Sequence, residues 1–275
     1  MTTELNFEKF PKHIIKPSIL ADSDKFLMKI AETQEEIDKT LRMRYEVFNI
    51  EQGHGLENGQ DPGVDVDKYD KYCLQLIVLN KETNLPVGTY RAHLGSIATK
   101  SIGFYSVGEY KIYGLEKVAS LSMEVGRSCV TKEFRKGSAV ALLWGGIGEL
   151  MMRAKLRYLF GCVSFEEYNP AAAWAIYEYL KKENLISDLI EGHPVQGYEL
   201  EHPPKSEVKK YLDDIRNTIK KYVPPLLKGY LRLGTKIAGP PVYDHEFKTI
   251  DFLIILDSFT IPERYARHYN YNAEK

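Results

Sequence analysis

The stretch MEVGRSCVTKEFRKGSAVALLW, residues 123–144, begins like a β-strand and ends like an amphipathic helix. Alternation of side chains along the strand half puts Glu124 and Arg127 on opposite faces. A glycine inside a strand often marks a bulge or a close backbone approach, so a bulge at Gly126 would bring both charged side chains to one face. Two hypotheses follow: the pair belongs to a functional site, or it is a structural ion pair near a sheet edge.

The junction between this strand and the helix is a basic turn that contains Arg135, Lys136 and Gly137. The first turn of a helix has free backbone N–H groups and carries the positive end of the helix dipole, and both features favour phosphate binding. Glycine at 137 would let a phosphate approach the backbone closely. The turn therefore indicates a phosphate site, unless it is an ordinary surface turn.

The segments around this stretch predict an α/β fold built on a mixed sheet. Between residues 34 and 53 apolar residues recur at helical spacing, which predicts a helix that ends at Gly53. Two strand-like runs joined by a short turn predict an antiparallel hairpin. The order β-α-β-β-(α)-β-α-β-α places strands at 26–33, 72–80, 85–94, 119–130 and 158–165, and later helices at 137–157 and 170–182.

After residue 192 the alternation of strand-like and helix-like segments becomes less regular. A charged helix is predicted at 205–221 and a further strand at 250–256. We therefore expect a catalytic domain of residues 1–190 and an extension of residues 191–275 that packs on the same core and covers the substrate channel.

The overall composition excludes several classes of protein. A formal net charge of −1 over 275 residues gives no general attraction to nucleic acid, so no nucleic-acid partner is expected. No run approaches the roughly 18 apolar residues of a membrane-spanning helix, and MTTELNFEKF lacks the apolar centre of a signal peptide. The three cysteines lack C-x-x-C spacing, as expected for buried thiols in a reducing compartment. A cytoplasmic protein is predicted.

Motifs of metal sites and of other enzyme classes are missing from the sequence. The segment DVDKYD, residues 65–70, lacks the glycine and the terminal glutamate of an EF-hand loop. No histidines have the HExxH or H-x₃₋₅-H spacing with ligands nearby, so no metal is expected and the histidines are assigned mostly to the surface. The G-x-S-x-G motif of serine hydrolases and the H-x₄-D motif of glycerolipid O-acyltransferases are absent as well.

The strand, the basic turn and the helix resemble the acyl-donor site of the GNAT acyltransferase superfamily, where such a turn cradles a pantetheine phosphate. The usual motif is Gln/Arg-x-x-Gly-x-Gly/Ala. Here Phe134 stands at the first position, followed by Arg135, Lys136, Gly137, Ser138 and Ala139. The resemblance implies the GNAT fold, a mixed and mostly antiparallel sheet flanked by helices, and an acyl-phosphopantetheine donor rather than a bound cofactor.

A narrower resemblance covers residues 26–267. The segments LRMRYEVF, DVDKYDKYC, VGTYRAH, FYS, MEVGRSCV, FRKGSAVALLW and YLFGCVSF occur in the order seen in the ornithine-lipid N-acyltransferases, often labelled hemolysin-like. That family transfers a 3-hydroxyacyl chain from acyl carrier protein to the α-amino group of ornithine, and a sister group uses glycine. Both resemble the acyl-homoserine-lactone synthases, whose shared skeleton corresponds here to Arg44, Phe48, Asp67, Asp70, Arg91, Glu124 and Arg127.

The resemblance and the chemistry of thioester aminolysis together imply roles for these residues. Glu124 and Arg127 form the predicted catalytic pair, with Glu124 as the base, directly or through a water, and with its pKa raised by burial. Backbone N–H groups of the same strand would stabilise the oxyanion. The remaining residues would form an ion-pair network that lines the amino-acid site, where an arginine clamps the substrate carboxylate. Asp67 or Asp70 would take a δ-ammonium group, unless DVDKYD is a solvated acidic loop.

The expected partners follow from this chemistry. Acyl carrier protein is acidic and needs a locally basic docking surface, for which Lys132, Arg135 and Lys136 are the first candidates. The cluster Arg153, Lys155 and Arg157 is a second candidate, or only complements the dipole of its helix. An amphiphilic product makes peripheral contact with the inner membrane plausible.

Three other functions stay open at this point. One is a glycine N-acyltransferase and another is a short-chain N-acetyltransferase that uses acetyl-CoA. The third is a non-enzymatic, hemolysin-like protein, which would need a pore-forming or amphipathic segment that the sequence does not show.

Overall fold

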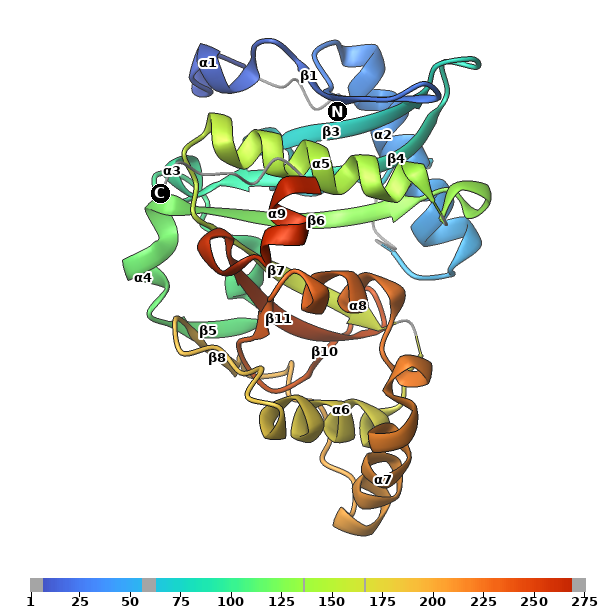
Figure 1. Ribbon diagram of the computed structural model, residues 1–275, viewed down its shortest axis with the longest axis vertical. Helices are drawn as coiled ribbons and strands as arrows, with labels where there is room; N and C mark the ends of the chain where they lie inside the picture. The colour runs from blue at the N-terminus through green and yellow to red at the C-terminus, as the bar shows by residue number, and fades with distance from the viewer. Residues whose placement is uncertain (1–6, 56–62, 136, 166, 269–275) are drawn as a thin grey trace.

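The computed structural model describes residues 7–55, 63–135, 137–165 and 167–268. Within them, nine strands form one sheet in the order β1-β2-β3-β4-β6-β7-β11-β10, with β9 paired to β11 (Figure 1). All pairs are antiparallel except β6 with β7. The strands are β1 (Ile19–Asp22), β2 (Phe26–Ile30), β3 (Leu74–Asn80), β4 (Pro86–Leu94), β6 (Ser122–Val130), β7 (Tyr158–Phe165), β9 (Lys236–Ile237), β10 (Val242–Asp244) and β11 (Thr249–Asp257).

Helices surround this sheet, and a small second sheet joins β5 (Tyr110–Tyr113) to β8 (Glu191–Pro194). The longer helices are α2 (Gln34–Tyr45), α5 (Ser138–Arg153), α6 (Pro170–Lys182), α7 (Lys205–Tyr222) and α8 (Pro225–Arg232). Short helical segments are α1 (Lys12–Ile15), α3 (Gly95–Ala98), α4 (Leu115–Val118) and α9 (Glu263–His268). The expected α/β architecture, a mixed and mostly antiparallel sheet flanked by helices, is confirmed.

Strand β3 shows how the sheet is covered on both faces. Leu74, Leu76 and Val78 belong to the same apolar cluster as α5, whereas Ile77 and Leu79 pack with α2. Because alternate residues of a strand point to opposite faces, α5 and α2 lie on opposite sides of the sheet. The continuous apolar run of this strand follows from burial on both faces.

Helix α2 begins at a capping box and ends in an irregular turn. The Thr33 hydroxyl accepts a hydrogen bond from the backbone N–H of Glu36, whose side chain accepts one from the Thr33 backbone in return. The expected helix from 34 to 53 is α-helical only to Tyr45 and continues as a π-helical turn over Glu46–Glu51. Turns of this kind are frequent at functional sites.

The pair β6–β7 is the point at which the sheet opens. The two strands pair in parallel only at Ser122↔Tyr158, Met123↔Leu159 and Glu124↔Phe160. Beyond these positions they part, although Gly161 still approaches Val125 so closely that a Cβ at 161 would lie 2.3 Å from the Val125 carbonyl oxygen. The rest of β6 keeps backbone partners on β4 alone.

A bulge in β6 accompanies this opening. Arg91 pairs with Gly126 and Thr89 with Cys129, so Tyr90 lies opposite both Arg127 and Ser128. Arg127 takes a left-handed conformation with φ of 51°. The bulge predicted at Gly126 is therefore centred one residue later, because Arg127 rather than the glycine takes the unusual backbone conformation.

Residues beyond 190 complete the sheet and cover the opening. Strand β11 pairs with β7 from Ile250↔Phe165 to Asp257↔Tyr158. Helix α8 lies against α5, where the Tyr230 and Trp144 rings pack edge to face with their centroids 4.4 Å apart. The Tyr230 hydroxyl is 3.2 Å from the Tyr90 hydroxyl of β4. The extension thus reaches across the parting strands.

Several predicted elements differ in extent. The strand expected at 26–33 ends at Ile30, and the helix expected at 137–157 ends at Arg153, because the following residues turn back toward β7. Helix 205–221 is confirmed by α7, and strand 250–256 by β11. The sheet strands β1, β9 and β10 and the pair β5–β8 were not predicted, since short strands have too few residues for a periodic pattern.

We predict that Gly161→Ala destabilises the protein, because its Cβ must displace the Val125 backbone. We expect the free energy of unfolding to fall by about 1–3 kcal/mol, the usual effect of overpacking. The control is Gly145→Ala on α5, where a Cβ meets nothing within 4 Å and helix propensity favours alanine by up to about 1 kcal/mol. Urea denaturation measures both; equal effects of the two variants would contradict the close approach of the strands.

Candidate active site

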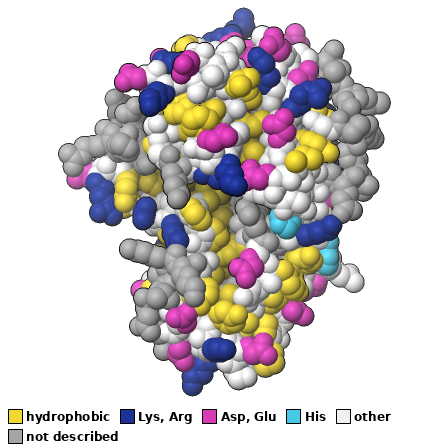
Figure 2. Space-filling view, turned by 90° about the vertical axis from the view of Figure 1, so that its right-hand side faces the viewer, with side chains coloured by type: hydrophobic (Ala, Val, Ile, Leu, Met, Phe, Trp, Pro, Cys, Tyr) yellow, Lys and Arg dark blue, Asp and Glu magenta, His cyan; other side chains and the backbone are white. Residues whose placement is uncertain are grey.

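A cavity of about 860 Å³ lies where β6 and β7 part. Polar groups from β4, β6 and the turn before β5 form part of its lining, namely Arg91, His93, Tyr105, Ser106, Glu124 and Arg127. Apolar side chains from α5, α8 and β11 form another part, namely Val140, Leu143, Trp144, Leu226, Tyr230 and Ile254. In Figure 2, apolar side chains gather in a band across the middle of one face, with Lys and Arg side chains beside it. The cavity therefore combines charged groups with a lipophilic wall.

Glu124 is a buried carboxylate held by one turn of backbone. Its Oε2 accepts a hydrogen bond from the Tyr105 N–H at 2.7 Å, and its Oε1 accepts from both the N–H and the hydroxyl of Ser106 at 2.7 Å. A carboxylate offers four lone-pair sites, so one on Oε2 has no donor among the described residues, and Glu124 lines the cavity. Burial raises the pKa of Glu124, and the three hydrogen bonds oppose part of that rise. The direction of the shift agrees with the expectation for a base.

Three arginines and three aspartates form a closed network beside this carboxylate. Arg44 donates to Asp65 through Nε at 2.7 Å and to Asp70 through Nη1 at 2.7 Å. Arg91 donates to Asp67 at 2.7 Å and to Asp70 at 3.3 Å. Arg127 donates to Asp65 at 3.2 Å and to Asp67 at 2.9 Å. Each arginine bridges two carboxylates, so three positive charges meet three negative ones.

This balance keeps Asp65 and Asp70 ionised although both are buried. Burial opposes ionisation of Asp70, but Arg44 and Arg91 outweigh it and hold the pKa of Asp70 below its usual value. For Asp65, Arg44 and Arg127 likewise lower the pKa against the effect of burial. Gln75 adds a hydrogen bond to Asp70 at 3.0 Å. The segment DVDKYD is thus tied to the core and is not a solvated acidic loop.

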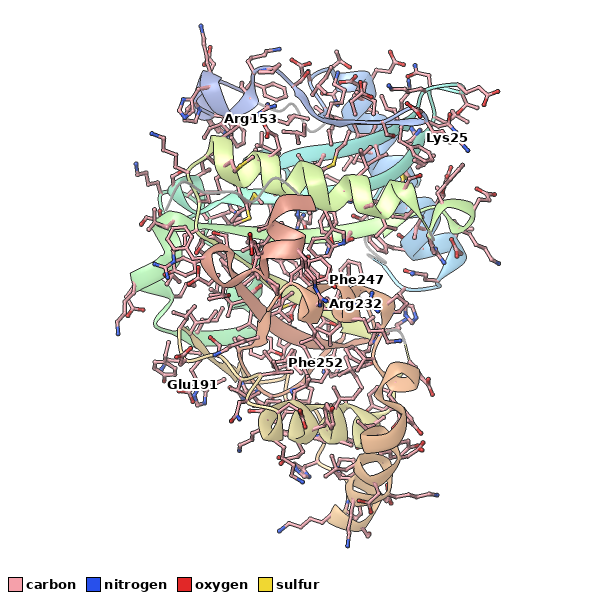
Figure 3. All side chains as sticks on the ribbon, in the orientation of Figure 1. Lys25, Arg153, Glu191, Arg232, Phe247 and Phe252 are labelled. Carbon is pink, nitrogen blue, oxygen red and sulfur yellow. The ribbon has the colours of Figure 1, made fainter. Side chains whose placement is uncertain are left out.

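The network lies behind the cavity wall and only part of it reaches the cavity. Arg91, Arg127 and Phe48 line the cavity, whereas Arg44, Asp67 and Asp70 do not. The Arg127 guanidinium stacks on the Phe247 ring, 4.3 Å from its centroid. Figure 3 labels Phe247 together with Arg232, a cation of α8 that also lines the cavity. The structure therefore brings the predicted residues together but divides them into a cavity wall and its support.

The predicted phosphate turn has its expected backbone form. Gly137 lines the cavity and precedes α5 with φ of 113° and ψ of −141°, a conformation that only glycine adopts readily. Among the described residues, no side chain caps the N-terminal N–H groups of α5. Arg135 lines the cavity too, but it pairs with Glu51 at 2.7 Å. Ser138 is exposed and Ala139 is buried, and Lys136 lies outside the described residues.

Three further carboxyl groups lie close to the cavity and were not predicted. Asp251 of β11 accepts hydrogen bonds from the Ser164 and Thr249 hydroxyls at 3.0 and 2.8 Å. Burial and the neighbouring Asp244 raise the pKa of Asp251 to about 7. Glu109 is also buried, and burial with the charges of Asp251 and Asp244 raises its pKa well above its usual value. In the part of the chain that the structure describes, no arginine forms an ion pair with these acids, although the charge of Arg127 opposes part of the rise in the pKa of Asp251.

One histidine and two arginines of the sequence analysis have particular environments in the structure. Most of the described histidines are exposed, as expected, but His93 is buried, lines the cavity, and has a pKa lowered by burial to about 4. Arg153 donates to the carbonyl of Ile19 at 2.7 Å and pairs with Glu149. Arg157 holds Asp257 in a bidentate pair at 2.9 and 2.6 Å. These two arginines make intramolecular contacts, as Arg135 of the first cluster does with Glu51, so docking of acyl carrier protein at either cluster stays a prediction.

Sequence signals for the missed residues existed only in part. An aspartate inside the apolar run TIDFLIIL is unusual for a buried strand, and it marks Asp251. Asp65 stands two residues before Asp67 in DVDKYD but outside the Asp-x-x-Asp spacing. The segment FYS, residues 104–106, belongs to the family resemblance, but nothing in it predicts that the backbone N–H groups of Tyr105 and Ser106 bind Glu124.

Comparison with known proteins gives the relatives of this chain. A family model described as an acetyltransferase (GNAT) domain matches residues 43–145. The chain is 34% identical over 257 residues to an L-ornithine N(alpha)-acyltransferase of Agrobacterium fabrum, which covers 90% of this chain and 86% of that protein. An L-ornithine N(alpha)-acyltransferase of Brucella abortus is 32% identical, with 90% of each chain covered. A CoA-dependent acyl-homoserine lactone synthase has a TM-score of 0.48 and 13% identity over 90% of this chain and 89% of its own.

Removal of Arg44 should be costly, because Asp65 and Asp70 would be left buried without a full set of cations. We expect Arg44→Met to lower the free energy of unfolding by about 3–5 kcal/mol, the usual effect of breaking a buried ion pair. Arg42→Met is the control, since Arg42 is exposed on the same helix and should change stability by about 0.5 kcal/mol or less. Similar unfolding curves for both variants would contradict a supporting role of the network.

Asp251 should make stability depend on pH in a predictable direction. Its pKa of about 7 in the folded chain lies above the value of about 3.9 in an unfolded chain. The folded state therefore holds the proton more tightly, and this contribution to stability is complete below pH 4 and lost as pH rises through 7. Between pH 4 and 7 we expect the free energy of unfolding of Asp251→Asn to rise relative to that of the wild type. The difference should grow by up to about 1.4 kcal/mol per pH unit. Thermal unfolding from pH 4 to 8 measures the difference; a constant difference would contradict it.

Proposed function

From the premise that this chain belongs to the L-ornithine N(alpha)-acyltransferase family, we propose that it moves an acyl chain from a phosphopantetheine thioester to the α-amino group of ornithine. The chain is an N-acyltransferase with a GNAT domain. The donor and the acceptor are the parts of this function that we propose. The product would be a lyso-ornithine lipid, an amphiphile that can leave toward a membrane surface.

The observation that supports this function best is the placement of Glu124. It is buried, held by three hydrogen bonds that leave one acceptor site, and it lines a cavity that has both charged and apolar walls. An α-amino group near pKa 8 is mostly protonated at neutral pH and needs a base before it can attack. Glu124 suits that task better than the neighbouring His93, because its pKa is raised while that of His93 is lowered.

The proposed reaction requires no covalent enzyme intermediate. The acceptor ammonium gives a proton to Glu124, and the free amine attacks the thioester carbonyl carbon to form the C–N bond. The C–S bond then breaks, and the second proton that the nitrogen loses reaches the leaving thiolate, directly or by way of Glu124. The remaining proton leaves Glu124 for solvent, which restores the carboxylate. Backbone N–H groups of β6, unpaired on the β7 side beyond Glu124, would stabilise the oxyanion.

The donor would lie along the gap between β6 and β7. The uncapped start of α5 at Gly137 suits a pantetheine phosphate, and the apolar side chains of α5, α8 and β11 suit a long acyl chain. We propose acyl carrier protein as the carrier, because Lys132 and Arg135 lie at the same junction and complement an acidic partner. CoA presents the same pantetheine chemistry and is the alternative carrier. The apolar wall that leads away from Glu124 disfavours a short-chain acetyltransferase.

A mass-spectrometric assay tests this function directly. The purified protein receives 3-hydroxypalmitoyl carrier protein with ornithine, glycine, lysine or homoserine lactone in parallel, and acetyl-CoA serves as the control donor. We expect N-acylornithine as the main product. N-acylglycine as the main product would overturn the acceptor, and acetylation alone would overturn the donor.

We predict that Glu124→Gln lowers turnover by about 10²–10⁴-fold, the range of general base catalysis. The glutamine amide would place an N–H₂ group against a backbone N–H donor and could disturb the local structure. Ser106→Ala is therefore the more specific test, because it leaves the Glu124 carboxylate in place. Loss of the Ser106 hydroxyl removes a hydrogen bond that favours ionised Glu124. The acidic limb of the kcat/KM profile should therefore move to higher pH in Ser106→Ala. If the acidic limb of kcat/KM lies at the same pH in Ser106→Ala and in the wild type, Glu124 is not the base.

A further inference from the structure

Glu109, Asp244 and Asp251 form an acidic group that contains no compensating cation. Their exposed fractions are 2%, 2% and 3%. Asp244 and Asp251 line the cavity, and the carboxyl oxygens of Glu109 and Asp251 lie within 4.8 Å of each other and of the Cys162 thiol. Among the described residues, no Lys, Arg or His forms an ion pair with any of the three. Buried carboxyl groups are rare unless they are paired.

Glu109 is the member that points most clearly to a missing partner. Neither of its carboxyl oxygens accepts a hydrogen bond of ordinary geometry from a described residue. The nearby Cys162 thiol opposes part of the rise in the pKa of Glu109, and it donates a hydrogen bond to the Ser106 hydroxyl at 3.5 Å. A buried acceptor without a donor costs free energy in the unliganded protein, which a donor brought by a ligand would recover.

We propose that Glu109, Asp244 and Asp251 form the subsite that binds the cationic side chain of the acceptor, a primary alkylammonium group. The assignment rests on the function proposed above and names the residues that select the amino acid. An ammonium group has three N–H donors and no acceptor, which suits three converging carboxyl groups. A single positive charge would also relieve the repulsion among these acids.

The position of the group relative to Glu124 fits a short diamine. Ser106 lies between the two, since its hydroxyl is 2.7 Å from Glu124 Oε1 and 3.5 Å from Cys162 Sγ. Tyr105 spans them as well, with its N–H on Glu124 and its hydroxyl 3.4 Å from Asp244 Oδ2. The two amino groups of extended ornithine are about 6 Å apart by standard bond lengths. An α-amine at Glu124 would therefore bring the side-chain amine to the acidic group.

The other acidic group cannot serve in this way. Asp67 and Asp70, the sequence-based candidates for the δ-ammonium, each pair with two arginines, so their negative charge is already balanced. A glycine acceptor would leave Glu109 unpaired, because it has no side chain to donate. The uncompensated acids thus favour a cationic acceptor.

A metal ion is the competing occupant, and the ligand set favours it less. Burial and the adjacent carboxyl groups raise the pKa of Cys162 well above its usual value, whereas a thiol binds metals as the thiolate. Both oxygens of Asp251 already accept hydrogen bonds from hydroxyl groups. A hydrogen-bonding cation fits these partners better than a coordinating one.

The first test compares acceptors. Specificity is measured as kcat/KM for ornithine and for norvaline, which has the same carbon chain without the δ-amine, in Glu109→Gln and Asp251→Asn. We expect each variant to lower the ornithine value about 10- to 100-fold, as for one charged hydrogen bond, and to leave the norvaline value unchanged. Asp257→Asn is the control, because it removes a buried carboxylate from the same strand outside the cavity. The ratio of kcat/KM for ornithine to kcat/KM for norvaline should stay at the wild-type value in Asp257→Asn. An equal loss of kcat/KM for both acceptors in Glu109→Gln and Asp251→Asn would overturn the proposal.

The second test is independent of acyl transfer. Ornithine, norvaline, Zn²⁺ and Mn²⁺ are added separately to the wild type and to Glu109→Gln, and the shift in Tm is measured. We expect a rise in Tm with ornithine in the wild type only. If no amino acid is acylated but this rise persists, the function proposed above fails and the subsite stands. A Glu109-dependent rise with a metal, and none with ornithine, would overturn the subsite.

Discussion

The structure depends on one interruption in its sheet, the end of parallel pairing between β6 and β7 after Glu124↔Phe160. Backbone hydrogen-bonding groups must be satisfied or reach a cavity, and here the parting strands leave such groups open beside a buried carboxylate. Helix α8 and strand β11 cover the opening rather than close it. The same feature therefore creates the cavity, exposes β6 and sets Glu124 at its wall.

Two acidic groups flank this opening and differ in how their charge is balanced. Asp65, Asp67 and Asp70 are matched by Arg44, Arg91 and Arg127, so the network is neutral, rigid and available as support. No Lys, Arg or His of the described residues forms an ion pair with Glu109, Asp244 or Asp251, and Glu109 has no hydrogen-bond donor among them. A protein interior tolerates the first arrangement at rest, whereas the second becomes favourable when a cation arrives. We therefore assign a structural role to the first group and a ligand-binding role to the second.

The sequence predicted those parts of the site that lie within short windows. Glu124, Arg127 and the Gly137 turn belong to one strand–turn–helix stretch, and Arg44, Asp67 and Asp70 belong to recognisable segments. The acidic subsite joins residues 109, 244 and 251, whose proximity arises from the pairing of β10 with β11 and from β5 beside them; no local pattern encodes it. The bulge position was missed by one residue, because Gly126 and Arg127 can each take up the extra length. Asp65 was missed because the spacing favoured its neighbours.

The most direct test of this account is a crystal structure with ornithine and a non-hydrolysable acyl-pantetheine amide. We expect the pantetheine chain between β6 and β7, the α-amine within hydrogen-bonding distance of Glu124 Oε2, and the δ-ammonium among Glu109, Asp244 and Asp251. An acyl-pantetheine bound elsewhere, or an ornithine with its α-amine away from Glu124, would contradict the account.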